Sequence, residues 1–178
     1  MSKTDSTAIF HIGLLVDDLE SSMATLGDGF GLVWSKVVSR QQLVWTPDEG
    51  QQTTPLRFTY SRQGPNRIEL LEGAPGSVWD AGQSAGVHHV GVWVDDVAAE
   101  VARLVGLGWM LEAAQQRPED GYGAMAYLRS PDGMVTHQVR LRAKAASVDR
   151  RCDFLEVAPR VVAARRHERA HCRRPSRN

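Results

Sequence analysis

The chain has 178 residues, of which 42% are apolar, and its formal net charge is zero. This length allows one domain, or two small halves that share a single core. Residues 1–141 carry 10 basic against 17 acidic side chains. Because phosphate binding needs a basic surface, this acidic body excludes nucleic acid as a partner of the core. No apolar run approaches the ~20 residues that cross a bilayer, so we expect no membrane partner either.

The two ends of the chain differ from the body. The opening "MSKTDSTA" is polar and shows no secretory signal, which predicts a cytoplasmic protein. Residues 143–178 form a basic tail rich in Arg and Ala, which we expect to be helical or disordered. A solvated appendage and an arm that binds nucleic acid or a membrane surface are both open interpretations. Cys152 and Cys172 lie in this tail and make neither a disulfide framework nor a zinc finger.

A short motif occurs twice, as "FHIGLLVDDL" and as "HHVGVWVDDV". When His11 is aligned with His89, five of nine positions are identical and the other four are apolar in both copies. Continuous apolar residues are typical of a strand that is covered on both faces. The Asp pair at the end of each copy predicts the N-cap of a following helix. Each helix is expected to end at glycine, in "LGDGFGL" and "VGLGW".

Three strand-like segments follow each predicted helix. They are "LVWSKVV", "LRFTYSR" and "RIELLEG" in the first half, and "WMLEAAQ", "AMAYLRS" and "MVTHQVRL" in the second. The sequence therefore predicts two βαβββ modules, at residues 8–75 and 76–142, that arise from internal duplication.

The alternation of side chains along the strands predicts a metal site. His11 and His89 lie on the face opposite the apolar residues that the helices would cover, so both point into whatever the sheet encloses. The same alternation in "RIELLEG" turns Glu69 inward, where a buried carboxylate needs a cation. Two histidines and one glutamate suit a divalent ion, with Zn, Ni, Co, Mn and Fe(II) all compatible. His88 is expected on the opposite face from His89.

These motifs, with "SPDGMVTHQVRL", resemble the vicinal oxygen chelate superfamily, and most of all its glyoxalase and methylmalonyl-CoA epimerase branch. The resemblance covers about residues 8–142. It implies an α+β fold in which tandem βαβββ modules form one curled mixed sheet with helices outside. It also implies one metal ion, with ligands on the first and last strand of each module.

The resemblance places the four ligands at His11, Glu69, His89 and His137. The last position is glutamate in the epimerase and glyoxalase relatives, so histidine there is a departure from the family pattern. Gln138 takes this place if the strand is shifted by one residue. Glu69 and His137 are the expected catalytic groups, and Glu49 and Glu72 are further candidates for a base.

The implied activity is proton transfer next to a carbonyl, by an isomerase, an epimerase or a glyoxalase-type lyase. The expected partner is a small, partly hydrophobic substrate in a pocket lined by Leu15, Phe58, Tyr60 and Trp93, and a homodimer is compatible with the family. One of Arg57, Arg62 and Arg67 could hold an anionic substrate group, although a surface row explains them more simply. Two other functions stay open, namely a non-catalytic binding protein of the antibiotic-resistance type and a ring-cleaving dioxygenase.

Overall fold

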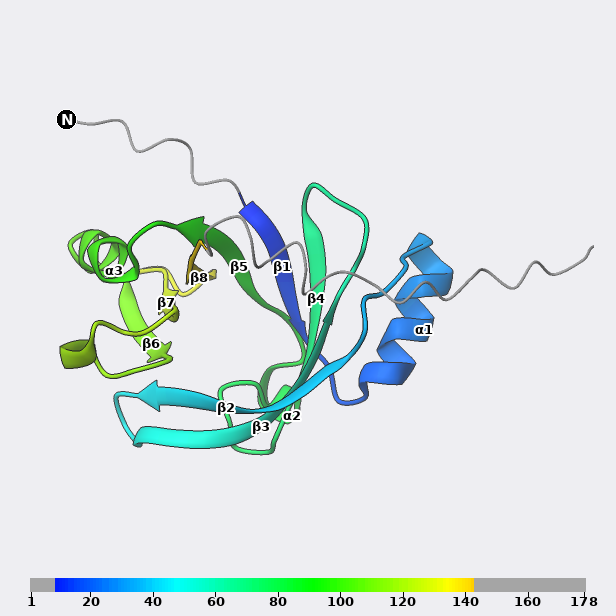
Figure 1. Ribbon diagram of the computed structural model, residues 1–178, viewed down its shortest axis with the longest axis horizontal. Helices are drawn as coiled ribbons and strands as arrows, with labels where there is room; N and C mark the ends of the chain where they lie inside the picture. Colours follow the sequence, from blue (N-terminus) through cyan, green and yellow to red (C-terminus); the bar gives the residue numbers. More distant parts are fainter. Residues whose placement is uncertain (1–8, 143–178) are drawn as a thin grey trace, which may run out of the picture.

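Residues 9–142 are described by a computed structural model, and the basic tail therefore lies outside the described residues. Eight strands close into a barrel in the order β1-β4-β3-β2-β6-β7-β8-β5 (Figure 1). The two longer helices flank the barrel on opposite sides. The predicted α+β fold of a curled mixed sheet with helices outside is confirmed.

The order of elements repeats from one half of the chain to the other. The first half contains β1 (Ile9–Leu15), α1 (Leu19–Phe30), β2 (Val38–Thr46), β3 (Gly50–Tyr60) and β4 (Arg67–Gly73). The second contains a short α2 (Ala81–Ser84), then β5 (Gly86–Val94), α3 (Val97–Val105), β6 (Met110–Ala114), a 3-10 turn (Pro118–Asp120), β7 (Met125–Arg129) and β8 (Thr136–Leu141). The module boundaries at residues 75 and 142 remain a prediction.

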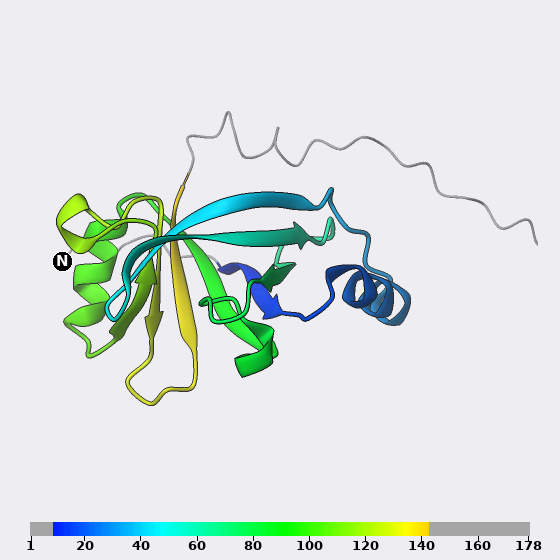
Figure 2. The ribbon, with the colours of Figure 1, turned by 90° about the horizontal axis from the view of Figure 1, so that it is seen from below.

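The halves join through two strand pairs. The first strands of the two halves, β1 and β5, pair antiparallel, and β2 meets β6 where Trp45 lies opposite Ala114. Within each half the first and last strands are parallel neighbours, β1 with β4 and β5 with β8. Figure 2 shows the β2–β3 hairpin crossing from the α1 side of the barrel to the α3 side. This topology brings the duplicated motifs side by side.

The predicted helix caps are present in both halves. The side chain of Asp18 accepts a hydrogen bond from Ser21 N at 2.8 Å, and that of Asp96 accepts one from Ala99 N at 3.0 Å. Each bond satisfies a backbone N–H that has no partner within its own helix. Gly31 ends α1 with a φ of +67°, a left-handed conformation that a side chain would oppose. The second aspartate of each pair therefore marks where its helix begins.

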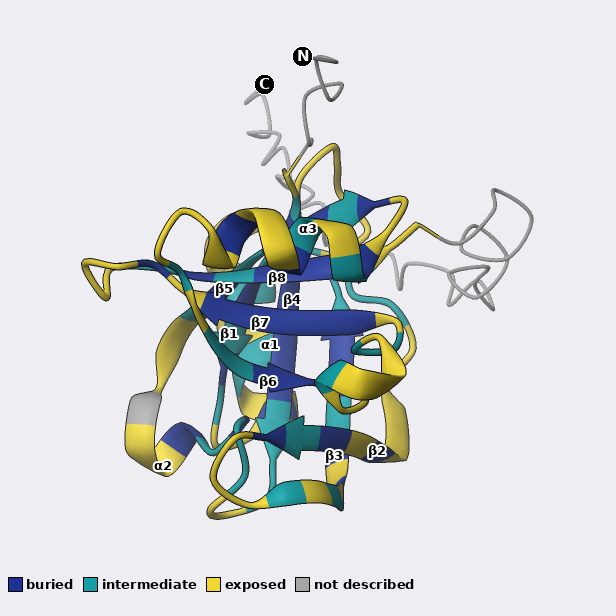
Figure 3. Ribbon diagram, turned by 90° about the vertical axis from the view of Figure 1, so that its left-hand side faces the viewer, coloured by how far each residue is buried: buried dark blue, intermediate teal, exposed yellow. Residues whose placement is uncertain are grey.

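Apolar side chains gather in two clusters. One lies inside the barrel around Leu71, Trp79 and Tyr127, and the other lies between α3 and the strands β5 to β8. Figure 3 shows the strands beside α3 buried and the outward side of α3 exposed. Among residues 9–142, none of the helices is both long and apolar enough to span a bilayer.

Candidate metal centre

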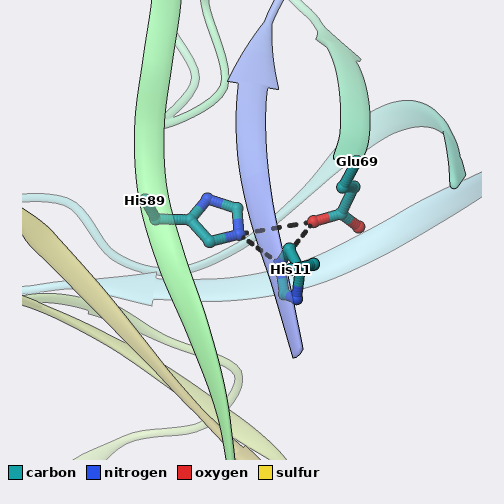
Figure 4. A group of neighbouring side chains, drawn as sticks. All are labelled: His11, Glu69 and His89. Carbon is teal, nitrogen blue, oxygen red and sulfur yellow. Dashed lines mark hydrogen bonds and ion pairs between the residues drawn. The ribbon is translucent and has the colours of Figure 1, made fainter. Parts of the chain in front are cut away.

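Three predicted ligands meet inside the barrel. His11 comes from β1, Glu69 from β4 and His89 from β5, and all three point toward one another (Figure 4). The Nε2 atoms of the two histidines are 2.7 Å apart. Oε2 of Glu69 lies 2.9 Å from His11 Nε2 and 3.3 Å from His89 Nε2. Both histidines are fully buried and Glu69 is 3% exposed, so water does not solvate the carboxylate or the imidazole nitrogens of this cluster.

A glycine from each motif makes room for the histidine of the other. A methyl group on Gly13 would stand 2.1 Å from a ring atom of His89, and one on Gly91 would stand 2.0 Å from a ring atom of His11. The histidine–apolar–glycine spacing thus serves two purposes, because each motif supplies one imidazole and the clearance for the opposite imidazole. This close approach is possible only where the two strands pair directly, as β1 and β5 do.

The protonation states suit a cation. Burial alone would raise the pKa of Glu69, but the histidine charges and hydrogen bonds outweigh burial and hold that pKa well below its usual range. Burial lowers the pKa of His89, against the opposing influence of Glu69. An ionised carboxylate and a neutral imidazole are the forms that bind metals.

The donor set fits a divalent ion. The two imidazole nitrogens that face each other at 2.7 Å can share at most one hydrogen bond, so lone pairs of the cluster remain that a cation can accept. One ion with bonds of about 2.1 Å can touch all three donor atoms. Among residues 9–142, His11, Glu69 and His89 are the one group of metal-binding side chains that converges in this way.

The structure corrects the expected position of the fourth ligand. His137 lies on the outer face of β8, with its ring 5.7 Å from that of Trp109, near the charges of Glu100 and Arg103 on α3. It is therefore not part of the cluster and cannot be its base. The inward residue is Gln138, which is 2% exposed and lines the cavity. The strand has the register, shifted by one residue, that the sequence left open as the alternative with Gln138 inward.

The pairing of parallel strands shows that Gln138 corresponds to Glu69. Glu69 lies opposite Gly13 in the β1–β4 pair, and Gln138 lies opposite Gly91 in the β5–β8 pair. The Oε1 atom of Gln138 is buried and has no hydrogen-bond partner among the described residues. An amide oxygen without a partner is a further donor atom that the cavity leaves available.

Tyr127 holds this amide in place. Its hydroxyl oxygen accepts hydrogen bonds from Gln138 Nε2 at 2.8 Å and from Trp79 Nε1 at 3.1 Å. Burial raises the pKa of Tyr127 well above its usual value, so the hydroxyl stays protonated. Because both neighbours donate, the hydroxyl's own hydrogen remains available to a molecule in the cavity. Sequence reasoning did not identify Tyr127 as a site residue.

A cavity of about 140 Å³ adjoins the centre. Its lining includes Arg40, Gln42, Phe58, Glu69, Gln138 and Arg140. Of the four residues predicted to line the pocket, Phe58 does so and Tyr60 packs beside it. Leu15 lies deeper in the core, and Trp93 stacks on Phe10 beside Arg140 instead of lining the cavity.

The other candidate bases are committed elsewhere. Glu72 accepts hydrogen bonds from Leu19 N at 2.8 Å and from Arg57 at 2.9 Å, so its carboxylate ties β3 and β4 to α1. Glu49 is exposed in the β2–β3 turn, where it accepts from Gln52. Neither carboxylate lines the cavity. Arg57 is likewise held by Glu20 and Glu72, which agrees with the simpler interpretation of a surface row for that residue.

His88 departs from the expected face, although its contact with His89 fits the structural or supporting role that the sequence predicts for it. The β1–β5 pairing is irregular at this residue, since Gly13 lies opposite His89 and Leu14 opposite Val87. The irregularity brings Nδ1 of His88 to 2.9 Å from Nδ1 of His89, and its ring to 5.3 Å from that of Tyr127. Burial lowers the pKa of His88 to about 3, so it stays neutral and can orient the ligand ring. A strand irregularity has no signature in this sequence that would have revealed this.

Comparison with known proteins agrees with this picture. The model of the Glyoxalase/Bleomycin resistance protein/Dioxygenase superfamily matches residues 10–127. A search of curated proteins finds no match.

Solved structures share the fold at low identity. Methylmalonyl-CoA epimerase from Mycobacterium tuberculosis is 17% identical, with a TM-score of 0.55 over 80% of this chain and 93% of that one. A variant of the Streptomyces coelicolor methylmalonyl-CoA epimerase, in complex with 2-nitronate-propionyl-CoA, is 19% identical, with a TM-score of 0.53 over 78% and 96%. A hypothetical protein from Bacillus halodurans is 18% identical, with a TM-score of 0.52 over 80% and 99%.

Proposed function

Because the chain belongs to the glyoxalase, bleomycin resistance protein and dioxygenase superfamily, as its sequence predicted, we propose that it is a metal-dependent enzyme that moves a proton next to a carbonyl. The observation that carries this proposal is the buried convergence of His11, Glu69 and His89 on one point beside a cavity. A divalent ion bound there would polarise a substrate carbonyl and stabilise the negative charge that develops on its oxygen.

The residues of the chain divide the remaining work. His11 and His89 would hold the ion, and Gln138 would supply the fourth donor. Glu69 is the one carboxylate that lines the cavity among residues 9–142, so it would serve both as a ligand and as the base that takes the proton. The hydroxyl of Tyr127 donates a hydrogen bond to the substrate oxygen on which charge develops.

This distribution favours an isomerase or lyase over a two-base epimerase. Epimerisation by two bases needs a second proton acceptor on the opposite face of the substrate. The described cavity offers one carboxylate, because Glu49 and Glu72 lie outside it. A reaction in which one base takes a proton and returns it to a neighbouring atom therefore fits these side chains best.

Metal analysis and isotope exchange test the proposal together. We expect about one divalent ion per chain, and deuterium uptake from solvent by a compound in a panel of 2-oxo acids, hemithioacetals and acyl-CoA thioesters. His11→Ala and His89→Ala should each abolish stoichiometric metal in a folded protein, whereas the matched control His137→Ala should retain it. Full metal content in both variants would refute the assignment of the centre. Wild-type protein that binds no ion and gains no melting temperature on its addition would favour a non-catalytic binder.

A second function has one specific observation in its favour. Two histidines and one carboxylate are the ligand set of non-haem Fe(II) enzymes that activate oxygen, and the fourth inward residue here is a neutral glutamine. This set keeps a ring-cleaving dioxygenase as the alternative. Oxygen consumption with catechols and Fe(II), without deuterium exchange in the panel, would establish that alternative over proton transfer.

A further inference from the structure

Two arginines enter the same cavity from opposite halves of the chain. Arg40 comes from β2 and Arg140 from β8, and both line the cavity that Glu69 and Gln138 line. Neither guanidinium has a carboxylate of residues 9–142 within ion-pair distance. Several other arginines of the described chain do, among them Arg57, Arg103, Arg117, Arg129 and Arg142.

Aromatic rings hold both guanidinium groups in position. Arg40 lies over the ring of Phe58 at 5.0 Å from its centre, and Arg140 lies over Trp93 at 5.8 Å. Arg140 also donates a hydrogen bond to the hydroxyl of Tyr60 at 3.3 Å. A guanidinium that stacks on a ring keeps the N–H groups at its edge free for a planar or tetrahedral oxyanion. The pair is therefore preorganised and has unused donors.

The charge of Arg140 acts on Arg40, whereas, against the effect of burial, the charge of Glu69 acts on Arg140 and raises its pKa. Burial, and then the charge of Arg140, lowers the pKa of Arg40. The charged residues that line the cavity are Arg40, Arg140 and Glu69, so positive charge exceeds negative there even though residues 1–141 as a whole are acidic. An anion between the two guanidinium groups would relieve their repulsion and use the free donors of both.

We propose that Arg40 and Arg140 bind an anionic group of the substrate, a carboxylate or a phosphate, while the reacting carbonyl end lies at the histidine–glutamate centre. The inference rests on the proposed function, because it names the substrate class of the same cavity. It differs from the expectation for Arg57, which is occupied by Glu20 and Glu72.

Anion binding can be measured without any reaction. Protein as purified, in a buffer without competing carboxylate or phosphate, is titrated by calorimetry with succinate, with inorganic phosphate and with the neutral analogue succinamide. We expect one of the anions to bind and the amide not to bind. Tighter binding of succinate identifies a carboxylate substrate, and tighter binding of phosphate identifies a phosphorylated one. Absence of binding by both anions, or equal binding of succinamide, overturns the proposal.

Substitutions assign the binding to the two arginines. Arg40→Gln and Arg140→Gln should each raise the dissociation constant of the bound anion by about tenfold, and the double variant should abolish binding. Arg103→Gln removes the same charge on α3, outside the cavity, and should change nothing. Arg40→Lys and Arg140→Lys keep the charge and guard against misfolding, and they should bind with intermediate affinity. An unchanged affinity in the double variant contradicts the proposal.

Failure of the anion-site proposal can be distinguished from failure of the proposed function. If deuterium exchange fails but the arginine-dependent affinity is present, the anion site stands and the reaction assignment falls. If exchange occurs in the wild type and the double variant keeps the same KM for the exchanging compound, the anion site falls alone.

Discussion

Helix α3 buries Val97, Val101 and Leu104 against β6, β7 and β8, whereas its counterpart α1 buries Leu19 and lies against β4. Phe30 at the end of α1 is 75% exposed. The first strands of the two halves, by contrast, have matching roles. Each supplies one imidazole and one glycine, Gly13 or Gly91, that makes room for the imidazole of the other strand. The duplicated unit has therefore kept its interior more alike than its exterior.

Three of the five identical positions of the motif show why. The histidines belong to the cluster that could hold a metal ion, the glycines admit the opposite histidine, and Asp18 and Asp96 cap the helices. These tasks depend on backbone position and particular atoms. Helix packing depends mainly on apolar area, which different side chains can supply. Substitutions of residues that contact the histidine–glutamate cluster should therefore have larger effects than substitutions in the helices.

Replacing Gly13 or Gly91, which make room for the opposite histidine, should have the largest effect on metal binding and stability. In Gly13→Ala or Gly91→Ala the new methyl group overlaps the opposite imidazole, so the ring must leave its position. We expect loss of stoichiometric metal and about 3 kcal/mol of destabilisation, measured by elemental analysis and denaturant unfolding. The matched control is Gly29→Ala in α1, where nothing lies within 4 Å of the new methyl group. That variant should keep its metal and gain up to about 1 kcal/mol.

Leu104 and Leu26 occupy equivalent places in α3 and α1 and test the outer packing. Leu104 is 3% exposed within the α3 cluster, and Leu26 is half-buried. Leu104→Ala should lower the free energy of unfolding by about 3 kcal/mol, because it leaves a cavity. Leu26→Ala should cost about 1 kcal/mol, because solvent already reaches its side chain. Equal losses in denaturant melts would show that α1 is packed as tightly as α3.

Exchanging Glu69 on β4 and Gln138 on β8 tests whether these equivalent positions of the two halves both reach the ion. Glu69→Gln removes the one carboxylate of the centre, and we expect metal affinity to fall by about a hundredfold. The double variant Glu69→Gln with Gln138→Glu moves that carboxylate to the equivalent strand and should recover most of the affinity, as measured by competition with a chelating dye. If the double variant binds no better than Glu69→Gln, Gln138 does not reach the ion. His137→Gln is the neutral control.

Much of this architecture follows from the sequence. Strand alternation was sufficient to predict the inward His11, Glu69 and His89, because the apolar residues between them must face the helices. The same rule, applied to "VTHQVRL", would have turned Val135 and Val139 toward α3 and Gln138 inward. The family resemblance instead places His137 inward, and a shift of one residue exchanges the two faces.

Other features depend on contacts between distant segments. The irregular pairing that turns His88 toward Tyr127 results from how β1 and β5 meet, 78 residues apart in the chain. The meeting of Arg40 and Arg140 depends on closure of the barrel between the two halves. No local pattern of hydrophobicity encodes such encounters, because each strand would alternate in the same way in an open sheet.

The helix caps provide the finest comparison, because their local hydrogen bonds are nearly equal and their surroundings differ. Asp96→Ala removes the cap of the tightly packed α3 and should lower global stability by about 1 kcal/mol. Asp18→Ala should have a smaller effect, since Glu72 still accepts from Leu19 N and fraying of α1 exposes little apolar surface. Denaturant melts measure the global loss, and hydrogen exchange should show opening confined to α1 in Asp18→Ala. An equal loss of global stability in both variants would mean that α1 unfolds only together with the barrel. Its folding would then be coupled to that of the barrel as strongly as the folding of α3 is.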